Sequence, residues 1–256
     1  MSFDVDPGAY AAFMGRFSRP LAPVFADFAG VGAGVPRGGT ALDVGCGTGV
    51  LTAVLAERLG AACVSAIDPS EPFVAQVRAA LPGVDVRAGR AEALPFEGAR
   101  FDGVLAQLVV HFMADPVGGI AEMARVARPG GVVAASVWDH AGGRGPLAAF
   151  WAAVREVTPG AADESGLPGV REGHLAELFR AAGLRDPVSA ELPVRVGHAS
   201  FEEWWRPFTL GVGPAGAHVA ALDDGGRERL RARCSEMLPA GPFTTTAIAW
   251  AVRARA

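Results

Sequence analysis

The stretch Thr40-Ala-Leu-Asp-Val-Gly-Cys-Gly-Thr-Gly-Val-Leu51 decides the fold class of this chain. Its apolar start predicts a short buried strand with one carboxylate, Asp43, and the residues from Val50 to Leu59 repeat with the period of a helix. Between them glycines stand at alternate positions, where they permit positive φ and leave no Cβ atom in the way of a ligand. The first turn of a helix also presents unpaired N–H groups. This order of strand, glycine turn and helix predicts a ligand cradle that suits an anionic group.

The spacing of the glycines distinguishes the possible ligands. A dinucleotide-binding turn, Gly-x-Gly-x-x-Gly, would need a third glycine at position 50, which is Val50. A phosphate-binding loop needs a lysine, and the sequence contains none. The observed Asp-x-Gly-x-Gly-x-Gly resembles motif I of the class I S-adenosylmethionine-dependent methyltransferases, although a tight turn without a ligand is the simpler alternative. The resemblance implies cofactor contacts at Asp43, Gly45, Cys46, Gly47 and Gly49.

A second acidic position agrees with this resemblance. Residues 62–67 predict a buried strand that ends at Asp68-Pro69-Ser70. A carboxylate at the end of the second strand can accept hydrogen bonds from both hydroxyls of a ribose, because it has two oxygens. The alternative is that Asp68 caps the helix expected to begin near Ser70. The register with the glycine turn favours the ribose contact, so Asp68 and Pro69 are placed in the cofactor site.

The segment Gly89-Arg-Ala-Glu-Ala-Leu-Pro-Phe96 resembles the adenine-binding loop of the same family, Gly-Asp-Ala-Glu-x-Leu-Pro-Phe. In that loop the aspartate accepts from the exocyclic amine of adenine, and the next backbone N–H meets a ring nitrogen. This sequence has Arg90 at the aspartate position, and a guanidinium cannot accept a hydrogen bond. Arg90 can stack on the ring, and the backbone of Ala91 can keep its contact.

The run Phe101 to Phe112 predicts a strand at the centre of a parallel sheet, because it is almost continuously apolar. The carboxyl ends of parallel strands face the ligand crevice. We therefore expect Gln107 in the cofactor site and His111 near the reacting methyl group, as a candidate general base ahead of His140. The alternative for His111 is a structural histidine that bonds the neighbouring loop.

A last signature, Arg128-Pro-Gly-Gly131 before the apolar strand 132–137, extends the resemblance from Thr40 to Asp139. The predicted fold is therefore a Rossmann-like α/β domain with a seven-stranded, mostly parallel sheet, an antiparallel last strand and a helical lid. Residues 245–252 are expected to form that last strand at an edge of the sheet. The single domain would divide into an N-terminal cap helix (8–28), a core (30–140, 173–198 and 243–256) and lid insertions (141–168 and 200–242).

The cap helix and the lid supply further candidate site residues. Arg16 in the cap helix is a candidate partner for the methionine carboxylate of the cofactor, with a solvated surface arginine as the alternative. Aromatic residues in a lid either line an acceptor pocket or anchor the lid. The candidates for binding the methyl acceptor are Trp138, Trp205 and Arg206.

Composition narrows the function further. The 256 residues are 50% hydrophobic and carry a formal net charge of −4, and without lysine they offer no basic face for nucleic acid. The three cysteines are too few and too scattered for a disulfide framework or a zinc site, so no metal is expected. No signal peptide or membrane-spanning run is recognisable, and we expect a cytoplasmic monomer or homodimer.

The resemblance implies transfer of a methyl group from S-adenosylmethionine to a small molecule, through an oxygen, nitrogen, sulfur or carbon nucleophile, with S-adenosylhomocysteine as the product. Two alternatives remain open. The protein could bind the cofactor without methylating, as a cyclase or a regulatory subunit would. It could also be an NAD-dependent oxidoreductase, although the glycine spacing fits that class less well.

Overall fold

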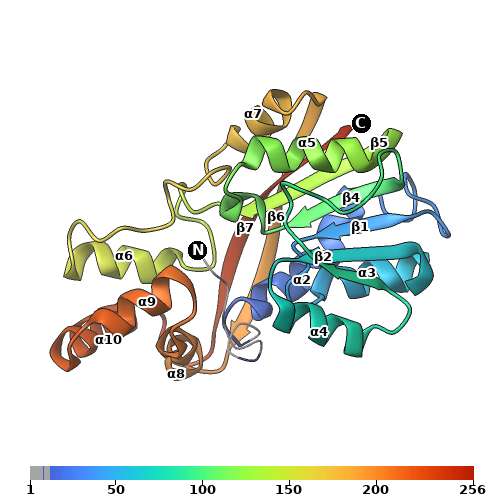
Figure 1. Cartoon of the computed structure of the whole chain (residues 1–256). Coiled ribbons are helices and arrows are strands. Elements are labelled where there is room, and N and C mark those ends of the chain that lie inside the picture. Colours follow the sequence, from blue (N-terminus) through green and yellow to red (C-terminus); the bar gives the residue numbers. More distant parts are fainter. Residues whose placement is uncertain (1–7, 9–11) are drawn as a thin grey trace.

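The computed structural model describes residue 8 and residues 12–256. Its strands form one seven-stranded sheet in the order β3-β2-β1-β4-β5-β7-β6 (Figure 1). The parallel pairs are β1–β2, β2–β3, β1–β4 and β4–β5, whereas β7 runs antiparallel to β5 and β6. The predicted seven-stranded, mostly parallel sheet is therefore confirmed. The strands are β1 (Ala41–Val44), β2 (Val64–Asp68), β3 (Asp85–Ala88), β4 (Phe101–Gln107), β5 (Ala127–Trp138), β6 (Arg185–His198) and β7 (Phe243–Arg255).

Helices cover both faces of the sheet and make a three-layer core (Figure 1). One face carries α2 (Gly15–Phe28), α3 (Val50–Leu59) and α4 (Glu71–Ala80), and the other carries α5 (Pro116–Val126) and α7 (His174–Ala181). Both faces of the central strands are thus removed from water, which explains why β1 and β4 are apolar runs without alternation. None of the described helices is both long and apolar enough to cross a membrane.

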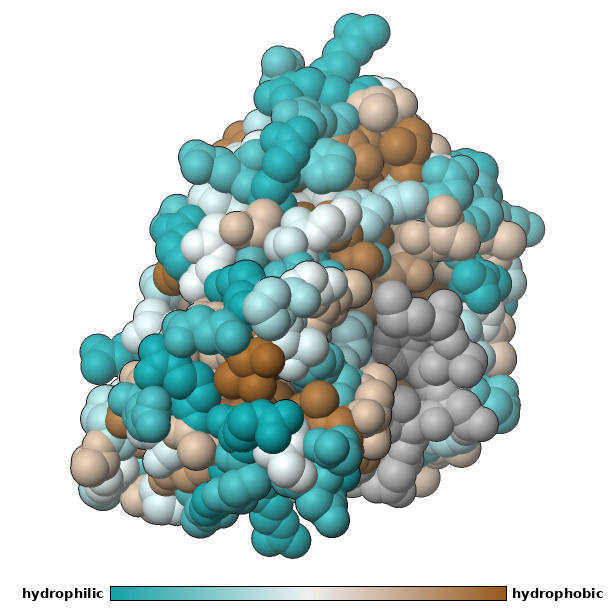
Figure 2. Space-filling model, turned by 90° about the vertical axis from the view of Figure 1, so that its left-hand side faces the viewer, coloured by the Kyte–Doolittle hydropathy of each residue, from teal (hydrophilic) through white to brown (hydrophobic). Residues whose placement is uncertain are grey.

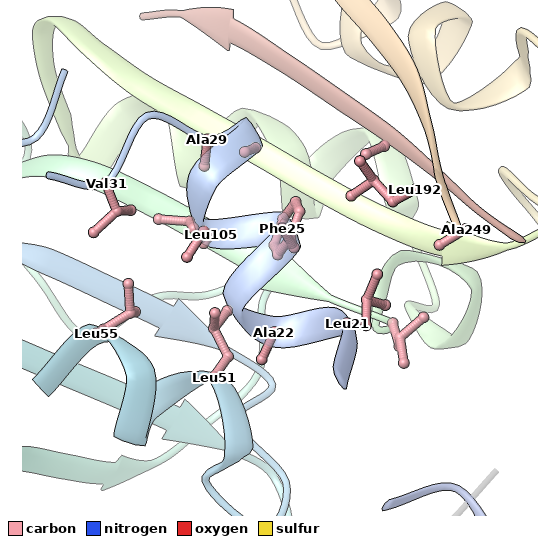
Figure 3. Packing of buried hydrophobic residues seen from close by; sticks show 14 of the residues in the cluster. Leu21, Ala22, Phe25, Ala29, Val31, Leu51, Leu55, Leu105, Leu192 and Ala249 are labelled. Carbon is pink, nitrogen blue, oxygen red and sulfur yellow. The ribbon is translucent and has the colours of Figure 1, made fainter. Parts of the chain in front are cut away.

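Helix α2 is the part of the predicted cap helix that lies within the described residues; most of the segment before it lies outside them. Its apolar side chains recur every four residues, and Phe25 is completely buried. They pack against Leu51 and Leu55 of α3 and against the face of the sheet (Figure 3). Burial of each such side chain stabilises the fold by about 1.5–3 kcal/mol, so α2 is an integral layer of the core.

The lid helices gather beyond the carboxyl ends of the parallel strands (Figure 1). They are α6 (Ala148–Val157), α8 (Phe201–Trp205), a 3-10 helix (Arg206–Leu210), α9 (Gly213–Ala221) and α10 (Asp224–Met237). They share a hydrophobic cluster of their own that includes Phe150, Trp204 and Phe208. On the side of the molecule that carries these helices, hydrophilic residues break the exposed hydrophobic ones into separate patches (Figure 2). The division into core and lid remains a proposal.

Two strands are shorter than the sequence indicates. Strand β2 begins at Val64, because residues 61–63 form a 3-10 turn after Gly60. Strand β4 ends at Gln107, because Leu108 adopts a left-handed backbone with φ of 63° and residues 110–112 form a second 3-10 turn, η2 (Val110–Phe112). The apolar run continues past the strand because Val110 is also buried. His111 therefore lies on a turn beyond the strand.

The prediction that the last strand forms an edge of the sheet is wrong. Strand β7 lies between β5 and β6, and β6 is the edge strand. The alternating burial along β6, with every second residue from Leu192 to His198 buried, is typical of a strand with one solvent-facing side. Helix α9 begins at Gly213, within the glycine-rich segment 211–216 of the lid.

Candidate active site

The glycine turn between β1 and α3 is closed by its own amides. The N–H groups of Gly45 and Cys46 donate to the carbonyl oxygen of Ile67, at 2.8 and 3.0 Å, and the N–H of Gly47 donates to Asp68. These three amides are therefore not available to a ligand. The neighbouring strand β2 and its last residue, Asp68, use these amides, so any contact of the turn with a ligand would be made by other atoms.

The glycines instead allow close packing and close approach. Gly45 has a φ of 71°, and a Cβ atom there would lie 2.5 Å from Val109 Cγ2. Gly47 also has a positive φ, 50°, but a Cβ atom there would meet nothing within 4 Å. Position 45 therefore needs glycine because any side chain there would clash with Val109, whereas Gly47 faces open space. A ligand can approach the backbone at Gly47 without meeting a side chain.

A pocket extends from the glycine turn to the loop after β3. Carboxylates, an amide and a guanidinium occur among otherwise apolar walls. The lining residues are Gly45, Gly47, Asp68, Pro69, Phe73, Gly89, Arg90, Ala91, Glu92, Gln107, Leu108, Val109, Phe112 and Met113.

A second, smaller pocket adjoins the larger one. It lies under the first turn of α3 and the middle of α2, and is lined by Ser18, Asp43, Gly45, Cys46, Gly47, Thr48, Val50, Leu51, Gln107 and Leu108. Four of these residues, at positions 45, 47, 107 and 108, also line the larger pocket. The two pockets therefore meet at the glycine turn, and together they suit an elongated ligand with two chemically different ends.

Asp68 stands at the carboxyl end of β2 on the wall of the larger pocket. Its Oδ2 accepts a 2.8 Å hydrogen bond from Gly47 N, and its Oδ1 accepts a 2.8 Å bond from Ser70 N. Burial raises the pKa of Asp68, and these two backbone donors oppose the rise. Each carboxylate oxygen can accept a second bond, which leaves capacity for two ligand hydroxyls. The bond to Ser70 orders the start of α4, so the predicted ribose contact and the helix-capping alternative are compatible.

Asp43 lies deeper, on the wall of the smaller pocket, and is buried. Its Oδ2 accepts a 2.6 Å hydrogen bond from Thr52 Oγ1. Burial raises the pKa of Asp43 to about 7, although the Thr52 hydroxyl opposes the rise and the charge of Asp68 adds to it. A nearby cation would restore its charge. Burial also raises the pKa of the neighbouring Cys46 thiol, which excludes a reactive thiolate there.

Gln107 ends β4 at the junction of the two pockets. Its Nε2 donates a 3.1 Å hydrogen bond to the carbonyl oxygen of Ser18 in α2, which fixes the side chain. Its Oε1 is buried and has no partner among the described residues. A buried acceptor without a partner is costly, and a ligand donor can satisfy it. Together with Asp43, this orphaned oxygen fits the ammonium group of S-adenosylmethionine, while Asp68 fits its ribose.

The two candidate histidines lie side by side, with ring centroids 6.1 Å apart. His111 is buried, its Nδ1 has no partner among the described residues, and neither of the two pockets described above includes it. The pKa of His111 is lowered to about 3, mainly by burial and to a lesser extent by the charge of His140. Burial also lowers the pKa of His140 to about 4, although the negative charges of Asp139 and Asp163 oppose this shift. Neither ring keeps the ordinary histidine pKa near 6.5, because both rings are removed from water.

The remaining predicted residues lie apart from the two pockets. Arg16 donates from Nη2 to Glu203 Oε1 at 2.6 Å and to the carbonyl oxygen of Gly197, not to either pocket. Trp138 is buried beside Phe17, and its Nε1 has no partner among residues 12–256. Trp205 is buried in the lid cluster, which is the anchoring use of an aromatic residue, and Arg206 lies on the lid surface near Arg16.

The sequence did not indicate several residues of the site. The carbonyl oxygen of Ser18 accepts a hydrogen bond from Gln107, and the hydroxyl of Thr52 donates one to Asp43. No sequence motif indicates either residue. Val109, Phe112 and Met113 follow β4 and form an apolar wall of the larger pocket. The sequence gives one indication of this wall: the apolar run is longer than a typical strand of about five or six residues, so its last residues should lie outside the strand.

Comparison with known proteins identifies the family. Residues 42–135 match the family model described as a methyltransferase domain, and this span contains the glycine turn, Asp68 and Gln107. This segment is a methyltransferase domain, and the chain has the class I methyltransferase fold. The seven-stranded sheet with its antiparallel β7 agrees with that assignment.

Among curated relatives, an uncharacterised protein of Mycobacterium tuberculosis (strain ATCC 25618 / H37Rv) is 32% identical over 175 residues, which are 68% of this chain and 62% of the relative. This chain therefore spans less than two thirds of that relative's length. The ubiquinone biosynthesis O-methyltransferase of Parvibaculum lavamentivorans is 45% identical over 96 residues, 36% of this chain and 37% of that enzyme. The structure of the [4+2]-cyclase SpnF covers 92% of this chain and 79% of its own, with a TM-score of 0.53 and 21% identity, and shows the fold alone.

Proposed function

We propose that this protein transfers the methyl group of S-adenosylmethionine to a small-molecule acceptor. One observation carries the proposal: the two pockets meet beneath the glycine turn, with Asp68 on the wall of the larger pocket and the orphaned Gln107 Oε1 at the junction. Few ligands need a paired-hydroxyl acceptor and an ammonium acceptor at the two ends of one elongated site. The proposed product is S-adenosylhomocysteine.

The residues of the chain would act mainly by binding and orientation. Asp68 would hold the two ribose hydroxyls, and Asp43 with Gln107 would hold the amino group of the methionine part. Bound S-adenosylmethionine supplies a methyl group on a positively charged sulfur, which is already electrophilic. The remaining task is to hold the acceptor in line and to keep water out, and α2 with the lid covers the carboxyl ends of the strands for that purpose.

On the acceptor side we propose Trp138 with the histidine pair. Trp138 ends β5, next to the strand that carries Gln107, and its unpartnered indole N–H can donate to an acceptor molecule. His111 and His140 are neutral above about pH 4 because of their burial, so either ring could accept a proton only from a group whose own pKa is low or lowered in the site. An acceptor carboxylate would need no base. Roles for Arg16, Trp205 and Arg206 stay predictions.

The experiment uses purified protein with methyl-labelled S-adenosylmethionine and a panel of phenols, amines, thiols and carboxylic acids. Formation of S-adenosylhomocysteine that depends on one acceptor class supports methyl transfer. The matched variants are Asp68→Ala, which should abolish turnover at low cofactor concentration, and Asp224→Ala, an exposed carboxylate on α10 that should change nothing. Tight cofactor binding without turnover on any acceptor would favour the non-methylating alternative.

That alternative keeps one specific point of support, since the fold is shared with the cyclase SpnF. The oxidoreductase alternative has none, because the glycine spacing departs from the dinucleotide pattern at Val50. We further propose a cytoplasmic monomer or homodimer that does not bind nucleic acid, in keeping with a net charge of −4 and the absence of lysine.

A further inference from the structure

A small cavity lies between the core and the lid and shares no lining residue with the two pockets described above. It is bounded by the start of α2, the end of β6, the segment before α6, and α8 with the 3-10 helix that follows it. It has room for little more than one water-sized group. The lining residues are Phe13, Arg16, Phe17, Pro146, Leu147, His198, Trp204, Pro207 and Phe208.

The walls of this cavity are mainly aromatic and carry no unpaired charge. The ring of Phe208 packs edge-on against Phe13, with centroids 5.4 Å apart, and its centroid lies 4.8 Å from that of Trp204. The guanidinium of Arg16 is neutralised, because its Nη2 donates to Glu203 Oε1 at 2.6 Å. The cavity therefore suits an uncharged group on an apolar molecule.

His198 is the polar exception in this lining. The residue is 3% exposed, and its Nε2 forms a hydrogen bond with Thr245 Oγ1 of β7, whereas its buried Nδ1 has no partner among residues 12–256. Burial lowers the pKa of His198, with a smaller contribution from the charge of Arg16, while the charge of Glu203 opposes the shift. The ring is therefore neutral at neutral pH. A buried nitrogen without a partner is costly, and a ligand in the cavity can remove that cost.

A hydroxyl group matches this nitrogen in either tautomer of the ring. If Nε2 donates to Thr245, Nδ1 is an acceptor, and if Thr245 donates to Nε2, Nδ1 carries the proton. A hydroxyl can both donate and accept, whereas a carbonyl oxygen only accepts and an ammonium only donates. A free water molecule is a poorer occupant, because it needs two to four polar partners and the other walls are mostly apolar.

The cavity adjoins the residues proposed for the acceptor side of the site. Phe17 lines the cavity, and its ring centroid lies 6.4 Å from that of His198 and 6.4 Å from that of Trp138. The next residue, Ser18, lines the smaller pocket and accepts the hydrogen bond from Gln107. Phe17 thus connects the cavity to the site of methyl transfer.

We infer that this cavity is a subsite for the methyl acceptor, in which His198 Nδ1 binds a hydroxyl group carried on an uncharged aromatic ring, at the end remote from the transferred methyl group. This inference rests on the proposed function. The subsite selects phenolic molecules, because aromatic walls favour a planar ring. It disfavours carboxylates and ammonium ions, which would lose their hydration there without a free counter-ion. Trp204 and Phe208 belong to the lid, so the lid must open for the acceptor to enter.

The test follows two probes, 4-fluorophenol and 4-fluorotoluene, by fluorine NMR titration of the full chain in the presence of S-adenosylhomocysteine. The probes differ only in the group that would meet His198. His198→Phe keeps an aromatic ring and removes both nitrogens. It should weaken binding of 4-fluorophenol by about threefold to tenfold, as loss of one neutral hydrogen bond implies, without weakening binding of 4-fluorotoluene.

His218→Phe is the matched control and should change neither affinity. His218 is a histidine of the lid helix α9 outside the cavity, and its Nε2 is also buried without a partner among the described residues. Equal losses for both probes in His198→Phe would make His198 a structural residue and overturn the inference. Unchanged binding of 4-fluorophenol in that variant, or no binding of either probe to wild type, would also overturn it.

The outcomes separate this inference from the function on which it rests. Methyl transfer has its own readout, the S-adenosylhomocysteine formed from any acceptor of the panel, so it survives a failure of the two probes. If the probes behave as expected and no acceptor yields S-adenosylhomocysteine, the hydroxyl-binding subsite stands and methyl transfer is overturned.

Discussion

Asp68 Oδ2 and Gly47 N are joined by a hydrogen bond of 2.8 Å that ties the end of β2 to the glycine turn. The same carboxylate orders the start of α4 through Ser70 N. One side chain on the pocket wall therefore shapes the turn, the helix and the surface that a ligand meets. Loss of this carboxylate should affect binding more than any other single change at the pocket.

The first prediction concerns that carboxylate. Asp68→Ala should weaken binding of S-adenosylhomocysteine by about 1.5–3 kcal/mol, because a charged hydrogen-bond partner is lost. Calorimetric titration measures the change, and Asp68→Asn, which keeps one acceptor oxygen for Gly47, separates loss of charge from collapse of the turn. Affinity equal to that of wild type in Asp68→Ala would mean that the carboxylate serves only the backbone.

The second prediction concerns the wall behind the turn. Gly45→Ala should destabilise the fold by about 1–2 kcal/mol for its left-handed backbone and by about 1–3 kcal/mol for the clash with Val109. Gly211 is also left-handed, with a φ of 72° and a ψ of 12°, and a Cβ atom there would meet nothing within 4 Å, so Gly211→Ala should show the backbone cost alone. Denaturant unfolding gives both values. The added change Val109→Ala should recover part of the Gly45→Ala loss, and a purely additive double variant would rule out the clash.

The third prediction is a pH dependence of stability set by Asp43. Its pKa is about 7 in the folded protein and 3.8 in an unperturbed chain, so between these values the folded state holds a proton that the unfolded state has lost. The stabilisation is complete below about pH 4 and is lost as the pH rises through 7, with a slope of at most about 1.4 kcal/mol per pH unit.

Denaturant unfolding from pH 4.5 to 7.5 measures this contribution. Asp43→Asn should flatten the pH dependence, because the amide cannot ionise and still accepts from Thr52. Asp224→Asn, at a fully exposed carboxylate, is the control. An unchanged slope in Asp43→Asn would show that Asp43 is ionised throughout this range.

The fourth prediction concerns His111. With a pKa lowered to about 3 by burial, its ring should stay neutral from pH 8 to pH 5, and its NMR ring resonances, assigned by their loss in His111→Asn, should not shift. The same burial lowers the free energy of unfolding in acid, because below about pH 6.5 His111 takes up a proton in the unfolded chain but not in the folded protein. A titration midpoint near 6.5 would return His111 to the role of a proton acceptor at neutral pH.

The sequence alone predicted the parts of this fold that local patterns encode. The strand, glycine turn and helix from Thr40 onward follow from apolar periodicity and from three glycines, and the structure has each where it was expected. The end of β4 could not be predicted, because Val110 is buried in the core and would be apolar on a strand or on a turn. Only the positive φ of Leu108 shows that the strand has ended.

The pairs that fix several of the candidate side chains are not local. Arg16 meets Glu203, 187 positions later in the chain, so no pattern near Arg16 could have indicated its partner. Gln107 depends in the same way on Ser18, 89 positions earlier. The orphaned Gln107 Oε1 and the burial of His111 are consequences of three-dimensional packing, and they change which chemistry each residue can perform.

The most direct test of the central claim is the melting temperature of the purified protein with S-adenosylhomocysteine or with NAD. A ligand that binds only the folded state at about a hundred times its dissociation constant adds about 2.7 kcal/mol of stability, which corresponds to roughly 5–10 °C for a chain of this size. The account predicts a rise of that order with S-adenosylhomocysteine, no rise with NAD, and loss of the rise in Asp68→Ala. An unchanged melting temperature with S-adenosylhomocysteine, or a larger rise with NAD, would contradict it.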